Sequence, residues 1–297
     1  MSIIETHLLT RSYGSRRGIE ELTLTVDEGT LFGFLGPNGA GKTTAIRVMV
    51  GLLRPTSGWA RIFGLDCWSQ GREIKAEVGY VPGDLRLPAW LSGGQALSLW
   101  ERIRRRKLVP HGRELAERFE LDLRVKVRNM SRGMRQKLGL ILALAHRPRL
   151  LILDEPTVTL DPLMQSLVHR MLREMAAAGH TIFFSSHTLN EVDQLCDRVA
   201  MIRNGRLVAN ESLATLRQHA GHEVTIHWQD GPAAAGLPPP FLRLEQRDGL
   251  IWRGMLDGPV DQLVAWLAER PFADLSIVRP DLDTLFRHYY ASEATAP

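Results

Sequence analysis

The apolar residues of this chain fall into two recurring patterns, short continuous runs and helical spacings. Residues 31–35, 150–153 and 181–184 form runs with the length and composition of strands that are buried on both faces. Helical spacing of apolar residues follows the first run over residues 44–53 and precedes the second over residues 138–145. Because buried strands alternate with helices, the pattern predicts an α/β domain built on a parallel sheet.

The pattern changes after about residue 215. Residues 224–228 alternate between apolar and polar as in a half-buried strand, and residues 231–240 then form a break rich in small residues and proline. We therefore expect a first domain over residues 1–215 and a small α+β domain over residues 216–297. Further elements expected in the second domain are strands at 242–244, 251–252 and 275–278, a helix at 260–269, and a closing helix that begins at 281–286.

A glycine-rich segment joins the run at 31–35 to the helix at 44–53. Two glycines with four residues between them are followed by Lys42 and Thr43, which is the pattern of a phosphate-binding loop between a strand and a helix. In such a loop the backbone N–H groups and the helix N-terminus face the phosphates, Lys42 reaches the outer phosphates and Thr43 ligates magnesium. The sequence therefore predicts a nucleotide-binding protein. The residues of the loop are Gly36, Pro37, Asn38, Gly39, Ala40, Gly41, Lys42, Thr43 and Thr44.

Two carboxylates follow the apolar run at 150–153. Asp154 would lie beside the phosphate loop and hold magnesium, usually through water, and Glu155 would polarise a water that attacks the terminal phosphate. Paired acids are also common where a strand simply exits into solvent. The functional interpretation is favoured here, because a phosphate loop needs a metal-binding acid from a neighbouring strand.

A third motif opens the helical stretch at 138–145. Residues 129–137 read Asn-Met-Ser-Arg-Gly-Met-Arg-Gln-Lys, in which Ser131, Gly133 and Gln136 match a Ser-x-Gly-x-x-Gln element. At this point the chain resembles the ATP-binding subunits of ABC transporters, whose signature has this form. Ser131 would cap the helix and leave N–H donors that point outward as a second anion site. The resemblance implies that this site holds the terminal phosphate of ATP bound to the other subunit of a pair.

The resemblance extends to three further positions. Asp161 matches the D-loop of the family, although Thr159 replaces the small residue that is usual there. His187 follows the run at 181–184, where the family has a histidine that contacts the terminal phosphate. A lone histidine is more often structural, but this spacing favours the functional role. Tyr13 stands where the family has the aromatic residue that stacks on adenine, although a tyrosine at a strand end is usually a core residue.

One position departs from the family. After a strand at 78–82, most relatives have a glutamine that contacts magnesium and links the nucleotide to the membrane subunit, whereas this chain has Gly83. We predict that Asp84 takes over the contact with the metal or its water. Some relatives in the drug and antibiotic exporter branch look similar at this point, so the resemblance is to that branch.

A second segment spells the commonest signature of the family. Residues 91–95 read Leu-Ser-Gly-Gly-Gln, yet they lie far upstream of Asp154, whereas Ser131 lies about one helix and a turn before it. Position is the stronger criterion, because the signature helix directly precedes the strand with the carboxylates. We therefore predict that Ser92 only caps a helix with apolar residues over 96–103, inside the helical subdomain.

Composition and charge add limits on partners and location. A chain of 297 residues with 44% apolar residues allows one large and one small globular domain, and the formal net charge of +4 is a mild basic bias. The basic run at 102–107 is typical of a solvated helix face, so no nucleic-acid partner is expected. Cys67 and Cys196 lack metal spacing, which fits a reduced cytosolic setting. No apolar run approaches the ~18 residues needed to span a bilayer and no signal peptide is recognisable, so any membrane role needs a partner.

The resemblance implies a P-loop NTPase of the ABC type with a helical subdomain at about residues 84–147. It further implies an ATPase that uses ATP and Mg²⁺, with Glu155, His187 and Lys42 as the catalytic residues. Its partners would be a second copy of itself or a homologous ATPase subunit, and integral membrane permease subunits of an exporter, reached from the cytoplasmic side of the cell membrane. The second domain is expected to be regulatory or dimerising, or else a stabilising extension.

Two other functions remain open. A soluble ABC-type ATPase could act on the ribosome or on DNA, although such relatives usually carry two ATPase domains or a long coiled-coil insertion. A small-molecule kinase would also have a phosphate loop, but it leaves Ser131 and His187 unexplained.

Overall fold

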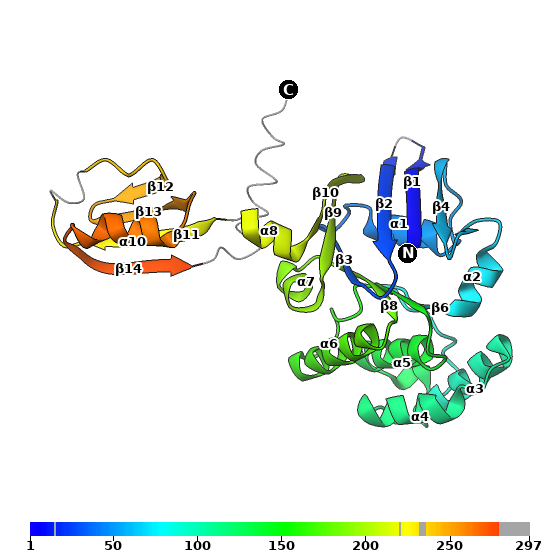
Figure 1. Cartoon of the computed structure of the whole chain (residues 1–297). Coiled ribbons are helices and arrows are strands. Elements are labelled where there is room, and N and C mark those ends of the chain that lie inside the picture. Colours follow the sequence, from blue (N-terminus) through cyan, green and yellow to red (C-terminus); the bar gives the residue numbers. More distant parts are fainter. Residues whose placement is uncertain (15, 220, 232–235, 279–297) are drawn as a thin grey trace. The chain divides into compact units, whose positions relative to one another are not determined.

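The structure is a computed structural model that describes residues 1–14, 16–219, 221–231 and 236–278. The chain divides into two compact units, Met1–Glu211 and Ser212–Pro297 (Figure 1). The elements up to the boundary are β1 (Ser2–Tyr13), β2 (Arg16–Asp27), β3 (Leu31–Leu35), α1 (Lys42–Met49), β4 (Ser57–Ile62), β5 (Leu65–Asp66), α2 (Gly71–Glu77), β6 (Val78–Val81), α3 (Gly93–Arg104), α4 (Val109–Arg118), the 3₁₀ helix η1 (Val127–Asn129), α5 (Arg132–Leu144), β7 (Leu150–Asp154), α6 (Pro162–Ala177), β8 (Thr181–Ser186), α7 (Leu189–Leu195), β9 (Arg198–Arg203) and β10 (Arg206–Ser212). The elements after it are α8 (Leu213–His219), β11 (His222–Trp228), β12 (Leu242–Asp248), β13 (Ile251–Leu256), α10 (Val260–Ala268) and β14 (Phe272–Val278).

A six-stranded sheet forms the centre of the first unit, with the strand order β10-β9-β3-β8-β7-β6. Strand β3 pairs in parallel with β8 and β9, and β7 pairs in parallel with β6 and β8. Every residue of β3, β7 and β8 is buried, as expected for parallel strands covered on both faces. The strands predicted at 31–35, 150–153 and 181–184 are therefore confirmed, and so is the α/β fold class of this region.

Helix α1 is held between this sheet and a second, antiparallel sheet of order β2-β1-β4-β5 (Figure 1). Ile46 and Met49 of α1 are fully buried in one core cluster with Leu24 of β2, Phe32 of β3 and Ile152 of β7. Because burying each such side chain is worth about 1.5–3 kcal/mol, this core fixes the start of α1, where the phosphate loop ends. The phosphate loop is therefore anchored to the hydrophobic core of the unit.

The helix predicted over residues 44–53 is shorter in the structure. Helix α1 ends at Met49, and Gly51 has a φ of +65°. A Cβ atom at Gly51 would lie 2.3 Å from the backbone oxygen of Cys67, so only glycine fits this close approach. Val50 and Leu53 therefore continue the helical spacing in the sequence, but they follow the last residue of α1 and do not form a further helical turn.

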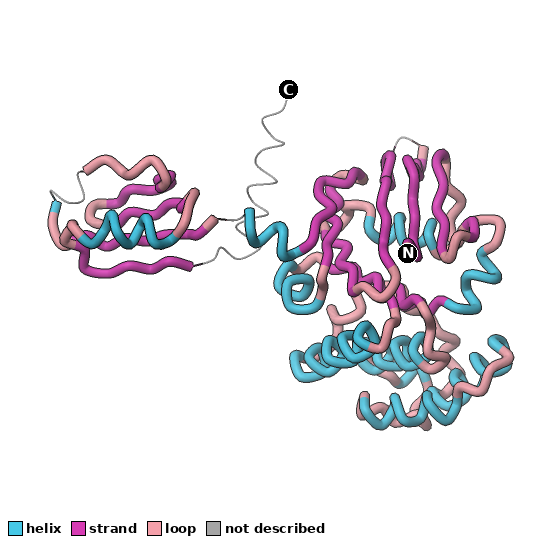
Figure 2. Tube along the Cα trace, viewed as in Figure 1, coloured by secondary structure: helices cyan, strands magenta, loops and turns pink. Residues whose placement is uncertain are grey.

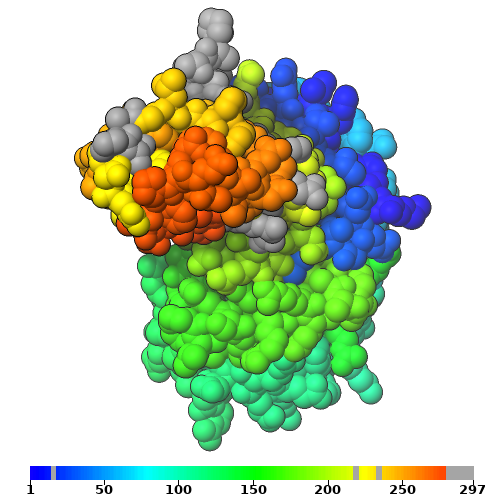
Figure 3. Space-filling model, turned by 60° about the vertical axis from the view of Figure 1, so that its left-hand side comes forward, coloured from blue at the N-terminus to red at the C-terminus, as the bar shows by residue number. Residues whose placement is uncertain are grey.

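Helices α3, α4 and α5 form a helical region between β6 and β7 in the chain, and Figure 3 shows its surface in teal to green. Helix α5 packs against β6, with Leu138, Leu140 and Ile141 fully buried. Arg104 at the end of α3 donates hydrogen bonds to the backbone oxygens of the segment that leads into β6, which ties the region to the sheet. Within the described ranges, no helix has the length and apolar composition needed to cross a bilayer.

The second unit contains a four-stranded antiparallel sheet of order β12-β13-β11-β14 and helix α10 (Figure 2). Its core includes Trp228 and Trp252, whose rings meet edge to face with centroids 5.0 Å apart, and Leu263 and Leu267 of α10. The strands predicted at 224–228, 242–244, 251–252 and 275–278 and the helix at 260–269 are confirmed. The closing helix predicted from 281–286 lies outside the described residues.

Candidate nucleotide-binding site

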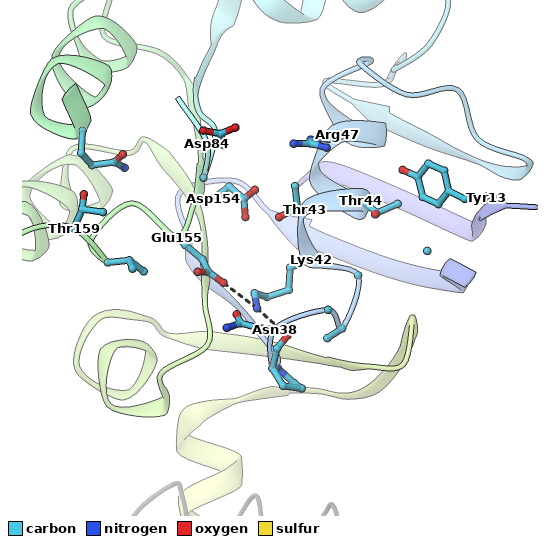
Figure 4. Close-up of a pocket in the computed structure, with 18 of the residues that line it drawn as sticks. Tyr13, Asn38, Lys42, Thr43, Thr44, Arg47, Asp84, Asp154, Glu155 and Thr159 are labelled. Atoms are coloured by element: carbon cyan, nitrogen blue, oxygen red, sulfur yellow. Dashed lines mark hydrogen bonds and ion pairs between the residues drawn. The ribbon is translucent and has the colours of Figure 1, made fainter. Parts of the chain in front are cut away.

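A cavity of about 760 Å³ lies where the phosphate loop, the end of β7 and the start of α5 converge (Figure 4). It brings together most of the residues predicted to bind the nucleotide and metal. Gly36, Ser131, Gly133, Asp161 and His187 lie outside its lining. Predicted residues that line the cavity are Tyr13, Pro37, Asn38, Gly39, Ala40, Gly41, Lys42, Thr43, Thr44, Asp84, Gln136, Asp154 and Glu155.

The phosphate loop ends in a helix N-terminus without a side-chain cap. Gly41 is the N-cap residue of α1, with a φ of 109°, and the first turn contains no acidic residue. A Cβ at Gly41 would lie 2.5 Å from the backbone oxygen of Gly18, so a larger residue would displace the loop. The first N–H groups of α1 and the positive end of its dipole therefore remain for an anion in the cavity.

Lys42 is a buried cation, with 4% of its side chain exposed. Its Nζ donates hydrogen bonds to the backbone oxygens of Gly36 at 2.5 Å and Pro37 at 3.2 Å. It also forms an ion pair with Oε1 of Glu155 at 3.1 Å (Figure 4). Lys42 thus connects the phosphate loop directly to the carboxylate after β7.

Glu155 stands in a backbone conformation that is uncommon for residues other than glycine, with a φ of +49°. The N–H of Glu155 donates hydrogen bonds to two atoms of Ser185 in β8, the backbone oxygen at 3.2 Å and Oγ at 3.1 Å. Its second carboxylate oxygen, Oε2, lies 3.3 Å from Nδ1 of His187. The structure therefore brings the three predicted catalytic residues, Lys42, Glu155 and His187, into one contact chain.

Asp154 ends β7 with only 1% of its surface exposed. Its Oδ1 accepts a hydrogen bond from Oγ of Ser185 at 2.9 Å, whereas the buried Oδ2 has no hydrogen-bond partner among the described residues. An unpaired buried carboxylate oxygen is costly, so it indicates a ligand. The pKa of the nearby Tyr80 hydroxyl is raised to about 12, first by burial and second by the negative charge of Asp154. Tyr80 therefore stays neutral.

The residues around Asp154 fit a magnesium ion. Thr43 and Asp154 line the same cavity and offer the oxygen donors that Mg²⁺ prefers. The described part of the chain contains no cluster of three or more His, Cys, Asp or Glu side chains that would hold a metal alone. An ion here would therefore depend on Thr43, Asp154 and phosphate oxygens together.

The loop after β6 approaches Asp154 through Gly83. A Cβ at Gly83 would lie 3.5 Å from Oδ2 of Asp154. The Asp84 carboxylate lines the cavity but forms an ion pair with Arg86 at 2.9 Å and is 67% exposed. The metal contact expected of Asp84 therefore stays a prediction.

Two serines cap helices through their Oγ atoms, but only one of these helices reaches the nucleotide cavity. Oγ of Ser92 accepts a hydrogen bond from the N–H of Gln95 at 3.2 Å, and Oγ of Ser131 accepts one from the N–H of Met134 at 3.1 Å. The predicted role of Ser92 as the cap of α3 is confirmed. Gln136 of α5 lines the nucleotide cavity, whereas Ser92 of α3 lines a separate one, so α5 is the one of these two helices that adjoins the nucleotide site. The assignment of the signature to Ser131 stays a prediction.

The remaining predicted residues have identifiable structural contacts. Gln136 is buried and its Nε2 donates to the backbone oxygen of Pro156 at 3.0 Å, which fixes α5 to the segment after Glu155. Asp161 caps α6 through a hydrogen bond from the N–H of Met164 at 2.9 Å. Tyr13 is 43% exposed, with the Arg11 guanidinium 5.0 Å from its ring centroid.

Sequence reasoning missed Ser185, which positions both carboxylates, and Arg47, which lines the cavity. Ser185 pairs in register with Asp154 on the adjacent parallel strand. A polar residue at the end of the strand predicted at 181–184 was the available signal, because carboxyl ends of parallel strands meet at one edge. Arg47 lies four residues after Thr43, on the same face of α1.

Comparisons with known proteins agree with this geometry. A family model described as ABC transporter matches residues 19–158. The bacitracin transport ATP-binding protein of Bacillus licheniformis is 38% identical over 70% of this chain and 69% of its own length. A daunorubicin resistance ATP-binding protein of Streptomyces coeruleorubidus is 33% identical over 94% of this chain and 92% of its own length.

Solved structures give the same result. The ATP-binding subunit of an ABC transporter covers 73% of this chain and 92% of its own, with a TM-score of 0.68 and 29% identity. A dimeric ATP-binding cassette bound to ADP and Pi in a post-hydrolysis state has a TM-score of 0.66 at 21% identity, over 71% of this chain and 98% of its own, and shows the same fold. The chain belongs to the family of ABC transporter ATP-binding proteins. It is an ATP-binding P-loop ATPase of that family, and the resemblance found from the motifs is confirmed.

Proposed function

We propose that this chain is the ATPase subunit of an exporter. In this proposal it pairs head-to-tail with a second copy of itself or a homologous ATPase subunit, and it drives separate membrane permease subunits from the cytoplasmic side of the cell membrane. The observation that carries the proposal is that the phosphate loop, the carboxylates after β7 and helix α5 line one and the same cavity. The relatives named for bacitracin transport and daunorubicin resistance support an exporter over an ATPase that acts on the ribosome or DNA.

Binding of ATP would replace the Glu155 carboxylate by a phosphate as the counter-ion of Lys42. Lys42 is paired with Glu155, and a terminal phosphate carries more negative charge than one carboxylate. Once Lys42 turns to the phosphate, Glu155 is free to accept the proton of an attacking water. His187 would keep Glu155 in place and contact the same phosphate, consistent with its 3.3 Å distance from Oε2.

Magnesium would be held by Thr43 and by Asp154, whose buried Oδ2 has no partner within the described chain. The bound ion would neutralise charge that develops on the phosphates. Asp84 would support it if the ion pair with Arg86 opens, and Tyr13 would stack on the adenine ring. The small second unit would serve regulation or dimerisation.

The proposed pair makes the hydrolysis rate dependent on protein concentration. Ser131 and Gly133 lie outside the cavity of their own subunit, so each phosphate loop would need those of a partner. We expect the purified chain to hydrolyse ATP slowly, with a rate per molecule that rises with concentration and requires Mg²⁺. Phosphate release measured across a dilution series, with the mass determined by light scattering, tests this expectation.

A rate per molecule that stays constant, measured on a species shown to be monomeric, would contradict the shared site. It would favour a kinase-like enzyme with a self-contained phosphate loop. The matched control is Ser92→Ala, which alters the other serine cap and should leave the concentration dependence intact.

A further inference from the structure

Three side-chain hydroxyls surround the carboxylate of Glu191 in the first turn of α7. Oγ1 of Thr157 donates a hydrogen bond to Oε1 of Glu191 at 2.5 Å. Oε2 accepts one hydrogen bond from Oγ of Ser186 at 2.6 Å and another from Oγ1 of Thr188 at 3.0 Å. Each oxygen of the carboxylate therefore binds a different segment, Oε1 the segment after β7 and Oε2 the segment after β8.

These two segments carry two of the three predicted catalytic residues. Thr157 is fully buried and lies two residues after Glu155. Ser186 comes directly before His187, whose Nδ1 is 3.3 Å from Oε2 of Glu155. Glu191 therefore connects the segment of the predicted general base to the segment of its histidine partner.

A helix cap alone does not account for the contacts of Glu191. Thr188 and Glu191 have the spacing of a capping box, in which the glutamate carboxylate accepts a hydrogen bond from the backbone N–H of the N-cap residue. Here the N–H of Thr188 donates to Oγ of Ser186 at 2.9 Å. The Glu191 carboxylate instead accepts a hydrogen bond from Thr157, which is 34 residues away in the chain. That hydrogen bond joins α7 to the segment after β7.

The segment after β7 needs support from its surroundings, because Glu155 has a φ of +49°. An uncommon backbone conformation of this kind persists only where neighbouring groups hold it. Gln136 of α5 donates a hydrogen bond to the backbone oxygen of Pro156 at 3.0 Å, and Glu191 of α7 binds the side chain of the next residue, Thr157. Of these two contacts, the one from α7 also reaches the segment after β8.

We propose that Glu191 is a positioning residue for ATP hydrolysis, which fixes Glu155 and His187 relative to each other. The proposal rests on the catalytic role proposed above for Glu155. Glu191 lies outside the lining of the nucleotide cavity, so it acts through its neighbours and not on ATP itself. Because misplacing a reacting group by about 1 Å can cost about 10² in rate, its contacts contribute to turnover and not to nucleotide binding.

Glu191→Ala should lower the first-turnover rate of phosphate release at saturating ATP by about tenfold to a hundredfold. Affinity for ATP should be kept, because the phosphate loop is unchanged. Glu191→Gln should have an intermediate rate, because an amide accepts hydrogen bonds at its oxygen but not at its nitrogen. The matched control is Glu174→Ala on α6, which removes a carboxylate that is 54% exposed and paired with Arg118. This control should retain the wild-type rate.

Thr157 tests the same contact from its other side. Thr157→Val keeps the shape of the side chain but removes the hydroxyl that donates to Glu191, so the rate should fall. Thr157→Ser restores a hydroxyl and should recover most of the lost rate. A loss caused by poorer packing alone would follow the opposite order, because serine leaves a larger void than valine. This pair also gives a result if Glu191→Ala does not fold.

A double variant separates positioning from a general loss of stability. If Glu191 acts by placing Glu155, adding Glu191→Ala to Glu155→Gln should reduce the residual rate by much less than Glu191→Ala reduces the wild-type rate. Phosphate release, ATP binding and thermal unfolding would be measured on the wild type, both single variants and the double variant.

With Glu155→Gln inactive, two outcomes would overturn the role of Glu191. One is a wild-type rate for Glu191→Ala or for Thr157→Val. The other is a double variant that shows the full loss of Glu191→Ala on top of that of Glu155→Gln, which would mean that the two residues act independently. Near-normal turnover of Glu155→Gln alone is a different failure, because it contradicts the proposed general base and with it the basis of this proposal.

Discussion

Glu155→Gln should lower steady-state ATP hydrolysis by about 10² to 10⁴, the usual effect of removing a positioned general base. Affinity for ATP should be kept or increased, because a neutral glutamine no longer pairs with Lys42 at 3.1 Å and so does not compete with phosphate. The variant should accumulate as a closed ATP-bound dimer, because closure of the pair needs ATP and its reopening needs hydrolysis. Phosphate release, nucleotide binding and light scattering on the same sample measure the three effects.

The matched variant is Lys42→Ala, which should weaken ATP binding itself. Lys42 is the buried cation of the phosphate loop, so its loss removes a positive charge that would pair with the phosphates. Near-normal turnover of Glu155→Gln in the assembled complex would show that another group accepts the proton from water. The contact chain from Lys42 through Glu155 to His187 would then be structural only.

Ser131→Arg should abolish hydrolysis in the assembled complex, whereas Ser92→Ala should be mild. An arginine at Ser131 adds bulk and a misdirected cation where the N–H groups of α5 would meet the partner's phosphate, so the pair cannot close. ATP binding to the monomer should survive, because Ser131 lies outside the lining of its own nucleotide cavity. The readouts are ATPase activity of the complex and nucleotide binding by the dilute subunit.

Ser92→Ala removes the hydrogen bond from Gln95 and with it a helix cap, which costs about 0.5 to 2 kcal/mol of stability. Thermal unfolding should report that loss, while hydrolysis per folded molecule changes little. The opposite result, an inactive Ser92→Ala with an active Ser131→Arg, would assign the signature to α3 and reverse the order of motifs described above.

The nucleotide site could be predicted largely from sequence, because its chemistry is local. A phosphate loop works through consecutive backbone N–H groups, so the residues from Gly36 to Thr44 had to be adjacent in the chain. The positions of Asp154 and Glu155 followed from the rule that parallel strands end at one edge of the sheet. The prediction that the signature lies at Ser131 and not at Ser92 used only the distance along the chain to Asp154.

Other features depended on contacts between distant residues. The hydrogen bonds of Ser185 with Asp154 and Glu155 connect β8 to the end of β7. The ion pair of Lys42 with Glu155 connects the phosphate loop to the same strand end. The length of α1 was overestimated, because the spacing of Val50 and Leu53 continues the helical pattern while Gly51 ends the helix through its approach to Cys67. The direction of a side chain also cannot be predicted from the sequence, as the ion pair of Asp84 with Arg86 shows.

The claim that this chain drives a membrane transporter is tested most directly by purifying it from a membrane extract in mild detergent. The tagged chain should carry with it a protein of several membrane spans, and ATP hydrolysis by that complex should exceed that of the chain alone. Lys42→Ala should bring down the same partner without the activity. Recovery of ribosomes, of DNA, or of the chain alone with full activity would contradict the transporter assignment and favour a soluble ATPase.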